Sequence, residues 1–371
     1  MNEDRFTLCQ LNRATLARQM LLQRETLSAT EAVGRLCGMQ AQEARPPFVG
    51  IWSRLAAFER DALHRAYHER SVVRATLMRG ALHAFPARDY LTFRGTLQPV
   101  LDRALRGVAA RAEGIDRQQV VMAAREILGH GPRTVNELRP LLAEQFPHAD
   151  ERILGYTVRT LLPLVMIPTA DRWAFPADSR FGLAEQWLGA PLLVDTPVEQ
   201  VILRYLAAFG PASVADAQTW SGLQGLNAVF ATMRAQLRVF RDGRGRELFD
   251  LPDAPRPHAD TPAPPRFLPE FDNLLLSHAD RRRILADAHR PLVTMPKNLR
   301  IRATFLLDGF VAGTWRVERK RSIATLHLAP FEAISREAAD VLIEEGERLI
   351  RFLEEDAERL AVAVAPPGEL A

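Results

Sequence analysis

The clearest evidence of the fold is the segment Gly129-His-Gly-Pro-Arg-Thr-Val-Asn-Glu137, because its pattern returns as Gly210-Pro-Ala-Ser-Val-Ala-Asp216. In both places a helical stretch ends at glycine and proline, the residues that usually stop a helix. A threonine or serine, followed three residues later by an acid, then opens the next helix in the manner of a capping box. The recurrence of this unit predicts tandem modules of one kind.

The sequence of each copy predicts three helices followed by a β-hairpin, which is the order of elements in a winged helix. In the first copy we expect helices at 118–128, 134–145 and 150–162, a strand at 165–167, a turn at 170–172 and a second strand at 173–175. In the second copy we expect helices at 198–208, from 213 onwards and at 226–237, with strands at 239–240 and 248–249 beside an arginine-rich turn.

The N-terminal part repeats this order more loosely. It predicts helices at 8–23 and 29–37, a helical segment at 48–55, and a hairpin over 71–85 that turns at Arg79-Gly80. The expected fold is therefore mainly α with β wings (α+β), made of three tandem winged-helix modules at 1–112, 113–192 and 193–251. Winged helices commonly place one helix in a DNA groove and wing arginines on the backbone, but they also serve as protein–protein modules.

The C-terminal part predicts a different architecture. Residues 252–267 are rich in proline and indicate a linker. Residues 268–371 predict a β-sheet and helix subdomain, with strands at 300–307, 310–318 and 322–328 and an Asp308-Gly309 hairpin turn. A long helix at 335–360 is expected to pack on this sheet through Val341, Leu342, Leu349 and Phe352.

The stretch Leu36-Cys-Gly-Met-Gln-Ala-Gln-Glu-Ala-Arg-Pro-Pro-Phe-Val-Gly-Ile-Trp52 contains the candidate catalytic residues, Gln40 and Gln42. The prolines at 46 and 47 favour extended backbone before them and disfavour a helix immediately after them. In an extended segment Gln40 and Gln42 project to the same side, where their amides can hold a water between donors and acceptors. The alternative is that both glutamines cap a helix end or contact solvent.

Composition indicates an ordinary soluble globular chain of several modules. The 371 residues are 47% hydrophobic and 25% charged, with a net charge of +3 and a pI of about 9.2, which does not by itself indicate nucleic acid. Lys297 and Lys320 are the only lysines, so nearly all the basic residues are arginines. Arginine suits phosphate recognition, but a GC-rich genome also replaces lysine with arginine.

The sequence lacks the motifs of several kinds of site and the signals of a secreted or membrane protein. Cys9 and Cys37 are the only cysteines, so neither a disulfide framework nor a Cys-x-x-Cys metal site is expected. No metal-ligand spacing, nucleotide-binding glycine loop or serine nucleophile elbow occurs, and we expect no metal and no cofactor. The charged N-terminus does not resemble a signal peptide and no apolar run is long enough to cross a bilayer, so we expect a cytoplasmic protein without a membrane partner.

A set of short motifs, spread from about Phe6 to Phe352, resembles the AlkZ-type DNA glycosylases. The motifs are Met39-Gln-Ala-Gln42, Pro46-Pro-Phe-Val-Gly-Ile-Trp52, Val72-Val-Arg74, Met78-Arg-Gly-Ala-Leu-His83, Leu97-Gln-Pro99, Leu268-Pro-Glu-Phe-Asp-Asn273, Leu276-Ser-His-Ala-Asp-Arg281 and Asp308-Gly-Phe-Val-Ala-Gly-Thr-Trp315. The resemblance implies tandem winged helices that line a basic concave surface. It also implies a Gln-aliphatic-Gln or Gln-aliphatic-Asp catalytic motif, and Gln40-Ala41-Gln42 matches the first.

The activity implied by the resemblance is excision of N-alkylated purines from double-stranded DNA, including bulky natural-product adducts and interstrand crosslinks, with the glutamines placing the water. An N7- or N3-alkylated purine is already a cation, so it departs without a general acid, through an oxocarbenium-like state. Two amides supply orientation and dipoles. No lysine lies near Gln40 in the sequence, so we expect a monofunctional enzyme that leaves an abasic site.

The candidate DNA contacts are basic residues in motifs, third helices and wings: Arg45, Arg79, His83, Arg159, Arg244, Arg246, Arg281 and Arg282. Two other functions remain open. A non-catalytic winged-helix transcriptional regulator usually dimerises on a palindrome, whereas three modules in one chain need no partner, so the enzyme is expected to be a monomer. A protein–protein scaffold would show no salt-dependent DNA affinity.

Overall fold

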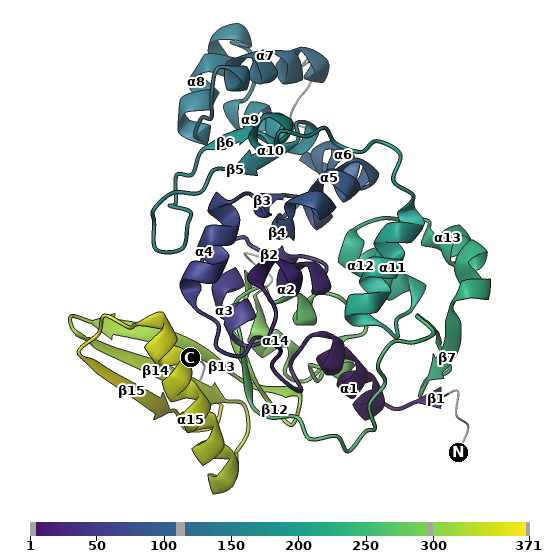
Figure 1. Cartoon of the computed structure of the whole chain (residues 1–371), viewed down its shortest axis with the longest axis vertical. Helices are drawn as coiled ribbons and strands as arrows, with labels where there is room; N and C mark the ends of the chain where they lie inside the picture. The colour runs from purple at the N-terminus through teal and green to yellow at the C-terminus, as the bar shows by residue number, and fades with distance from the viewer. Residues whose placement is uncertain (1–4, 109–115, 296–299, 369–371) are drawn as a thin grey trace.

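The computed structural model describes residues 5–108, 116–295 and 300–368 (Figure 1). The N-terminal part occupies the centre of the view, with the next segment above it and the following one to its right. The C-terminal sheet and its long helix project to the lower left. The chain is therefore a mixed α+β structure in which later segments are arranged around the first.

The N-terminal part is a series of short helices with three strands of one sheet. Its elements are β1 (Arg5–Phe6), α1 (Leu8–Arg18), α2 (Ala29–Arg35), β2 (Met39–Gln40), α3 (Pro46–Trp52), α4 (Arg60–His68), β3 (Val72–Thr76), the 3-10 turn η1 (Met78–Gly80), β4 (Leu82–Pro86), α5 (Ala87–Thr96) and α6 (Gln98–Val108). Capping boxes at Thr7 and Ser28 open α1 and α2. The expected β3–β4 hairpin is present, with Arg79 and Gly80 in its turn at positive φ.

Two expectations for this part were wrong. The prolines at 46 and 47 do not prevent a helix but begin α3, because the first helical positions need no backbone N–H donor and proline already has a helical φ. The first helix ends at Arg18 instead of residue 23, since Met20 adopts a positive φ that a helix does not allow.

The next two parts follow the repeated order of elements. The first contains α7 (Arg117–Gly129), α8 (Val135–Gln145), α9 (Glu151–Leu161), β5 (Leu164–Met166), β6 (Phe181–Leu183) and α10 (Ala184–Leu188). The second contains α11 (Val198–Phe209), α12 (Val214–Ser221), α13 (Leu226–Met233), η3 (Arg234–Gln236), β7 (Arg238–Asp242) and β8 (Glu247–Asp250). The capping boxes predicted at Thr134 and Ser213 open α8 and α12.

The strand predicted at 173–175 is absent, and β6 pairs with β5 in its place. The aromatic side chain of Trp173 instead packs on Phe48, with ring centroids 5.2 Å apart. Strand β5 also pairs with β3, so the hairpins of the first two parts join in one sheet of order β2-β4-β3-β5-β6. Strand β2, which carries Gln40, is an edge of this sheet.

The C-terminal part begins inside the predicted linker. It contains β9 (Arg266–Leu268), η4 (Asn273–Leu275), η5 (Arg281–Arg283), α14 (Arg290–Val293), β10 (Thr294–Met295), β11 (Arg300–Ile301), β12 (Thr304–Leu307), β13 (Phe310–Lys320), β14 (Ile323–Pro330), α15 (Arg336–Leu353) and β15 (Arg359–Val364). Strands β9 and β12 to β15 form a sheet of order β15-β14-β13-β12-β9. Helix α15 contacts this sheet, as expected.

The predicted helix at 335–360 was too long. Helix α15 ends at Leu353, and residues 359–364 form β15, parallel to β14. The packed face of α15 contains Leu342, Leu349 and Leu353, whereas Val341 points to solvent. Within the described ranges no helix has both the length and the apolar composition needed to cross a membrane.

Two buried ion pairs connect distant parts of the chain. Arg18 donates to both carboxylate oxygens of Asp250 at 2.7 and 2.8 Å, which joins α1 to the end of β8. Arg54, just after α3, donates to both oxygens of Asp272 at 2.9 Å, and each side chain is only 1% exposed. The second pair fixes the segment before η4 against α3, directly beside the strand that carries Gln40.

Candidate active site

The two candidate glutamines lie on the outer side of the edge strand β2 and the residues that follow it. Met39 and Ala41 are buried in the core, whereas Gln40 is half-buried and Gln42 is exposed. This burial pattern fits the alternation expected of an extended segment. The backbone continues to pair with β4 after Gln40, because Ala41 N donates to Leu82 O at 2.7 Å.

The side-chain amide of Gln40 is oriented by Arg79 in the β3–β4 turn. Arg79 Nη2 donates to Gln40 Oε1 at 2.8 Å. A guanidinium has no acceptor, so the atom that faces it must be the amide oxygen. Gln40 therefore keeps one lone pair of Oε1 and both hydrogens of its amide nitrogen available, since that nitrogen has no hydrogen-bond partner among the described residues.

Gln42 presents a second amide of the same orientation. Its Oε1 accepts a long hydrogen bond of 3.5 Å from Leu82 N on β4, and its amide nitrogen makes no hydrogen bond within the described part of the chain. Both glutamines thus have their oxygen turned towards the β3–β4 hairpin and their N–H donors free. Such a pair can bind the oxygen and a hydrogen of one water.

The hairpin turn is itself held by buried contacts. Arg79 also donates through Nη1 to the backbone oxygen of Trp220, at the end of α12. Burial, and then the charge of Arg281, lower the pKa of Arg79 to about 10, so the guanidinium remains charged at neutral pH. The turn that positions Gln40 is therefore fixed to the third part of the chain.

His83 adds a neutral acceptor beside Arg79. Its Nδ1 lies 2.9 Å from the Ala81 oxygen, which can only accept, so Nδ1 carries the hydrogen and Nε2 is the acceptor. Nε2 lies 3.5 Å from Arg79 Nη2. Burial, and then the charge of Arg79, lower the pKa of His83 to about 3, so the ring is neutral at pH 7.

Two further residues hold the backbone of the glutamine segment, and neither was predicted as a site residue. Asn273 donates through Nδ2 to Gly38 O at 3.0 Å, and its Oδ1 accepts from Gln40 N at 3.3 Å. Arg74 on β3 donates through Nε to Ala41 O at 2.8 Å and through Nη2 to Gln42 O at 3.0 Å. The only sequence signals were an asparagine at the end of Leu268-Pro-Glu-Phe-Asp-Asn273 and a charged residue inside a strand.

Arginines form ion pairs with the carboxylates nearest in sequence to the glutamines and with those beside Asn273. Glu43 forms an ion pair with Arg300. Glu270 accepts from Arg45 at 2.9 Å. The described residues contain no group of three or more His, Cys, Asp or Glu side chains suited to a metal ion. The chemistry offered at this edge is therefore that of amides and arginines.

The predicted DNA contacts fall into separate places. Arg79 and His83 belong to the Gln40 cluster, and His83, at 1% exposed, offers almost no surface to DNA in this state. Arg45 is paired with Glu270, and Arg159 on α9 lines a cavity of the second part.

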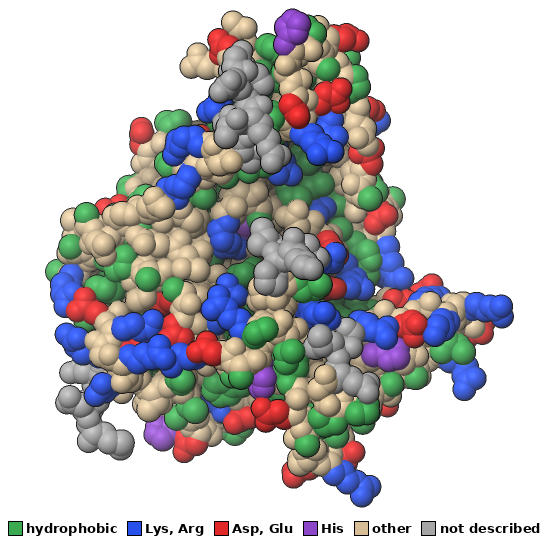
Figure 2. Space-filling model, turned by 180° about the vertical axis from the view of Figure 1, so that it is seen from behind, with side chains coloured by type: hydrophobic (Ala, Val, Ile, Leu, Met, Phe, Trp, Pro, Cys, Tyr) green, Lys and Arg blue, Asp and Glu red, His purple; other side chains and the backbone are tan. Residues whose placement is uncertain are grey.

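The remaining four candidates line one hollow of about 290 Å³ between the β7–β8 turn and η5: Arg244, Arg246, Arg281 and Arg282. Asp280 pairs with two of them, Arg246 and Arg282, at 2.7 and 2.6 Å. The guanidinium of Arg281 makes no hydrogen bond or ion pair to a described residue, and its Nη1 is buried without a partner. Figure 2 shows the molecule from behind, with lysine and arginine side chains across the middle of that face and along the projecting C-terminal sheet.

Comparison with known proteins assigns the chain to a family. A relative from Streptomyces sahachiroi, named interstrand DNA cross-link repair glycosylase, is 29% identical over an alignment of 356 residues; the alignment covers 88% of this chain and 93% of the relative. The solved structure of Streptomyces sahachiroi DNA glycosylase AlkZ has the same fold, with a TM-score of 0.79 and 24% identity over 97% of this chain and all of that one. The family model described as DNA glycosylase AlkZ-like matches residues 33–352. An enzyme is thereby favoured over the alternative of a regulator, and the chain belongs to the AlkZ-like DNA glycosylase family.

Proposed function

We propose that this DNA glycosylase hydrolyses the N-glycosidic bond of N7- or N3-alkylated purines in double-stranded DNA, with Gln40 and Gln42 placing the attacking water. The observation that carries the proposal is the pair of amides on the outer side of an edge strand, with free N–H donors and oxygens turned to one hairpin. The backbone contacts of Asn273 and Arg74 support it, because they hold the pair rigidly from two sides.

The chemistry needs little more than this pair. A cationic purine is a good leaving group, so no proton has to be delivered to it. The deoxyribose passes through an oxocarbenium-like state, to which oriented amide dipoles and a bound water contribute stabilisation. The neutral ring of His83 fits this scheme, and Glu43 and Glu270 are each held by an arginine.

The product is an abasic site, without cleavage of the strand. A glycosylase that also nicks DNA uses an amine to form a Schiff base. Lys320 lies at the end of β13, where it pairs with Glu318 at 3.1 Å, and Lys297 is outside the described residues. Purified enzyme should therefore leave an alkylated strand intact until heat or base is added.

The substrates extend to bulky natural-product adducts and interstrand crosslinks. The relative named as a cross-link repair glycosylase motivates this extension. The surface position of the site supports it: the cavity beside Gln40 measures only about 10 Å³, so a base is not enclosed there as it is in a base-flipping enzyme. A lesion that reacts at an open edge tolerates a large substituent or a tether to the opposite strand.

The duplex is bound by three winged-helix modules, at 1–112, 113–192 and 193–251, through the basic residues on their hairpins and third helices. The order of helices and hairpin in the third module supports this division. One chain then spans the duplex as a monomer in the cytoplasm, and both of these properties stay predictions.

The decisive test is release of 7-methylguanine from duplex DNA by the wild type, the Gln40→Ala/Gln42→Ala double variant and the control Gln119→Ala, which changes an exposed glutamine of α7. We expect release by the wild type and the control, and none by the double variant although it still binds duplex. Tight, sequence-selective binding without release by any of the proteins would instead support a regulator.

A further inference from the structure

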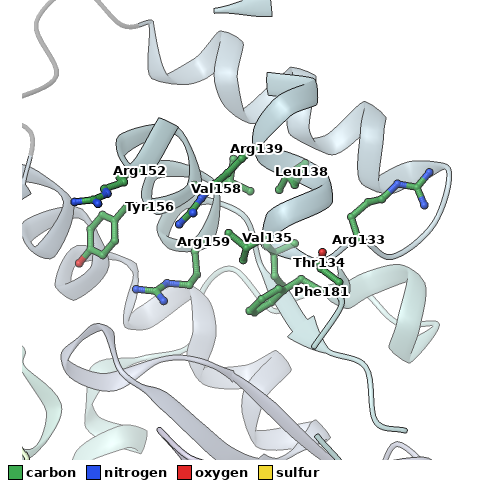
Figure 3. Close-up of a pocket in the computed structure, with 12 residues that line it drawn as sticks. Arg133, Thr134, Val135, Leu138, Arg139, Arg152, Tyr156, Val158, Arg159 and Phe181 are labelled. Atoms are coloured by element: carbon green, nitrogen blue, oxygen red, sulfur yellow. The ribbon is translucent and has the colours of Figure 1, made fainter. Parts of the chain in front are cut away.

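A cavity of about 220 Å³ opens between α8 and α9 of the second part, away from Gln40 and Gln42. Figure 3 shows the side chains of Arg139, Arg152 and Arg159 on the same side of this cavity as Tyr156, whereas Arg133 points away from them. The described residues that line it include no aspartate or glutamate. The cavity is therefore strongly electropositive on one side.

The four arginines that line this cavity have no acidic partner among the described residues. None of the four forms an ion pair with a described residue, and the Nε atoms of Arg139 and Arg159 are buried without a hydrogen bond. Arg159 is held over the ring of Tyr156, 5.3 Å from its centroid. Buried donors without partners are costly and require an explanation, and a bound anion supplies one.

The opposite side of the cavity is apolar. Figure 3 shows Val135, Leu138 and Phe181 on that side, and Val158 and Leu164 complete the apolar lining. An inorganic anion would use the arginines alone and leave this floor uncovered. The ligand that satisfies both sides has a phosphate and a flat, largely apolar ring, which is the chemistry of a nucleotide.

The cavity adjoins the turn that positions Gln40. The hydroxyl of Tyr156 lies 3.9 Å from the place where a Cβ atom on Gly80 would stand, and Arg79 of the same turn donates to Gln40. Helix α6 contacts both η1 and α9 and so links the two places. The η1 turn and α6 therefore connect the cavity to the glutamines.

We propose that this cavity binds one nucleotide of the substrate DNA, turned out of the base stack beside the lesion, with its phosphate on Arg139 and Arg159 and its base against the apolar floor. This inference rests on the proposed function. Unstacking a nucleotide is unfavourable in free DNA, and the phosphate and ring contacts offset it. The site thus holds the duplex open next to the lesion without enclosing the damaged base itself.

The test places 2-aminopurine, which brightens when unstacked, at each position in turn beside a stable abasic analogue in a duplex. We expect a several-fold rise in fluorescence at one position on binding wild-type protein. The rise should disappear in Arg139→Gln/Arg159→Gln and persist in the control Arg125→Gln, an exposed arginine on α7 that does not line the cavity.

A second variant guards against misfolding of the first. Gly155 lies in α9 and lines the cavity, and a Cβ there would meet Arg139 Nε at an ordinary 3.7 Å. Gly155→Leu therefore fills the cavity while it raises the helix propensity, and it too should abolish the rise. If no position brightens with the wild type, or if the rise persists in both variants, the inference is wrong.

Two further measurements separate the possible sources of failure. Deoxyadenosine monophosphate and inorganic phosphate are titrated against the wild type and Gly155→Leu. Binding of the free mononucleotide to the wild type alone, without any change in the duplex, would overturn the assignment to substrate DNA. The same proteins are assayed for 7-methylguanine release. No release by the wild type would contradict the proposed function. Release without a 2-aminopurine signal would contradict only this inference.

Discussion

Arg79 Nη2 and Gln40 Oε1 are joined by a hydrogen bond of 2.8 Å, so a charged guanidinium orients the first candidate catalytic amide. This arrangement sets a condition on catalysis. A cationic purine and an oxocarbenium-like sugar are both repelled by a positive charge. The charge of Arg79 is compatible with such a reaction when phosphates of the bound strand lie close enough to balance it. The orientation of Gln40 is thereby coupled to the presence of DNA.

Arg79→Lys should slow excision more than it weakens binding. Lysine keeps the charge but not the planar fork that reaches both Gln40 Oε1 and the Trp220 oxygen. A charge-assisted hydrogen bond contributes ~1.5–3 kcal/mol, so the rate of 7-methylguanine release at saturating enzyme should fall by about ten-fold or more. Single-turnover kinetics measure this rate directly.

Arg103→Lys is the matched control, because Arg103 Nη1 donates to the oxygen of Gly222 near the same end of α12 but does not contact Gln40. Its single-turnover rate should stay close to that of the wild type. An unchanged rate in Arg79→Lys would show that Gln40 does not depend on this guanidinium.

Asp272→Asn should strongly destabilise the folded chain. The change leaves Arg54 buried and without its carboxylate partner, a kind of loss that costs ~3–5 kcal/mol. Asp308→Asn is the control, since Asp308 also pairs with an arginine but is 78% exposed, and its loss should cost under ~1 kcal/mol. Urea unfolding of both variants measures the difference, and equal stabilities would contradict the role given to the buried pair.

Helices and their starts were predictable from the sequence because their signals are local. Thr134 and Ser213 open helices through hydrogen bonds to residues three positions away. The end of α15 was not predictable in this way: the glutamate-rich segment after Leu353 favours helix, but residues 359–364 gain more by pairing with β14. Long-range pairing overrides local preference in such segments.

In the candidate site, too, only the features with local signals were predictable. Gln40 and Gln42 could be placed on one side of an extended segment from their spacing alone. Asn273 could not be assigned to them, because it reaches Gln40 across 233 positions of sequence. The cavity between α8 and α9 was equally hidden, since its arginines are ordinary surface residues until the fold brings them together without acidic partners.

His83→Gln should reduce the acid sensitivity of the folded state. The pKa of His83 is lowered from 6.5 to about 3, so between these values the unfolded chain binds a proton that the folded chain does not. Stability therefore falls as the pH drops below 6.5, by up to ~1.4 kcal/mol per pH unit for this group. Above pH 6.5 this histidine contributes no pH dependence.

Urea unfolding at pH 7.5 and pH 5 should thus show a smaller loss of stability in His83→Gln than in the wild type. His278, whose pKa is likewise lowered to about 3, remains in both proteins and cancels from the comparison. His68→Gln, at an exposed position, should behave as the wild type does. Identical pH dependence in all three proteins would mean that His83 titrates normally.

Excision should require a positively charged base. Gln40 and Gln42 cannot donate a proton of useful acidity, His83 is neutral at pH 7, and Glu43 is ion-paired, so the leaving group has to supply its own charge. The wild type should release 7-methylguanine but not 7-methyl-7-deazaguanine, which has the same shape without the charge, although duplexes with either base should bind alike. Chromatography of the released bases measures both reactions in parallel. Release of the neutral base at a comparable rate would require a general acid at this edge of the sheet, and the assignment of the reaction to two amides would then be wrong.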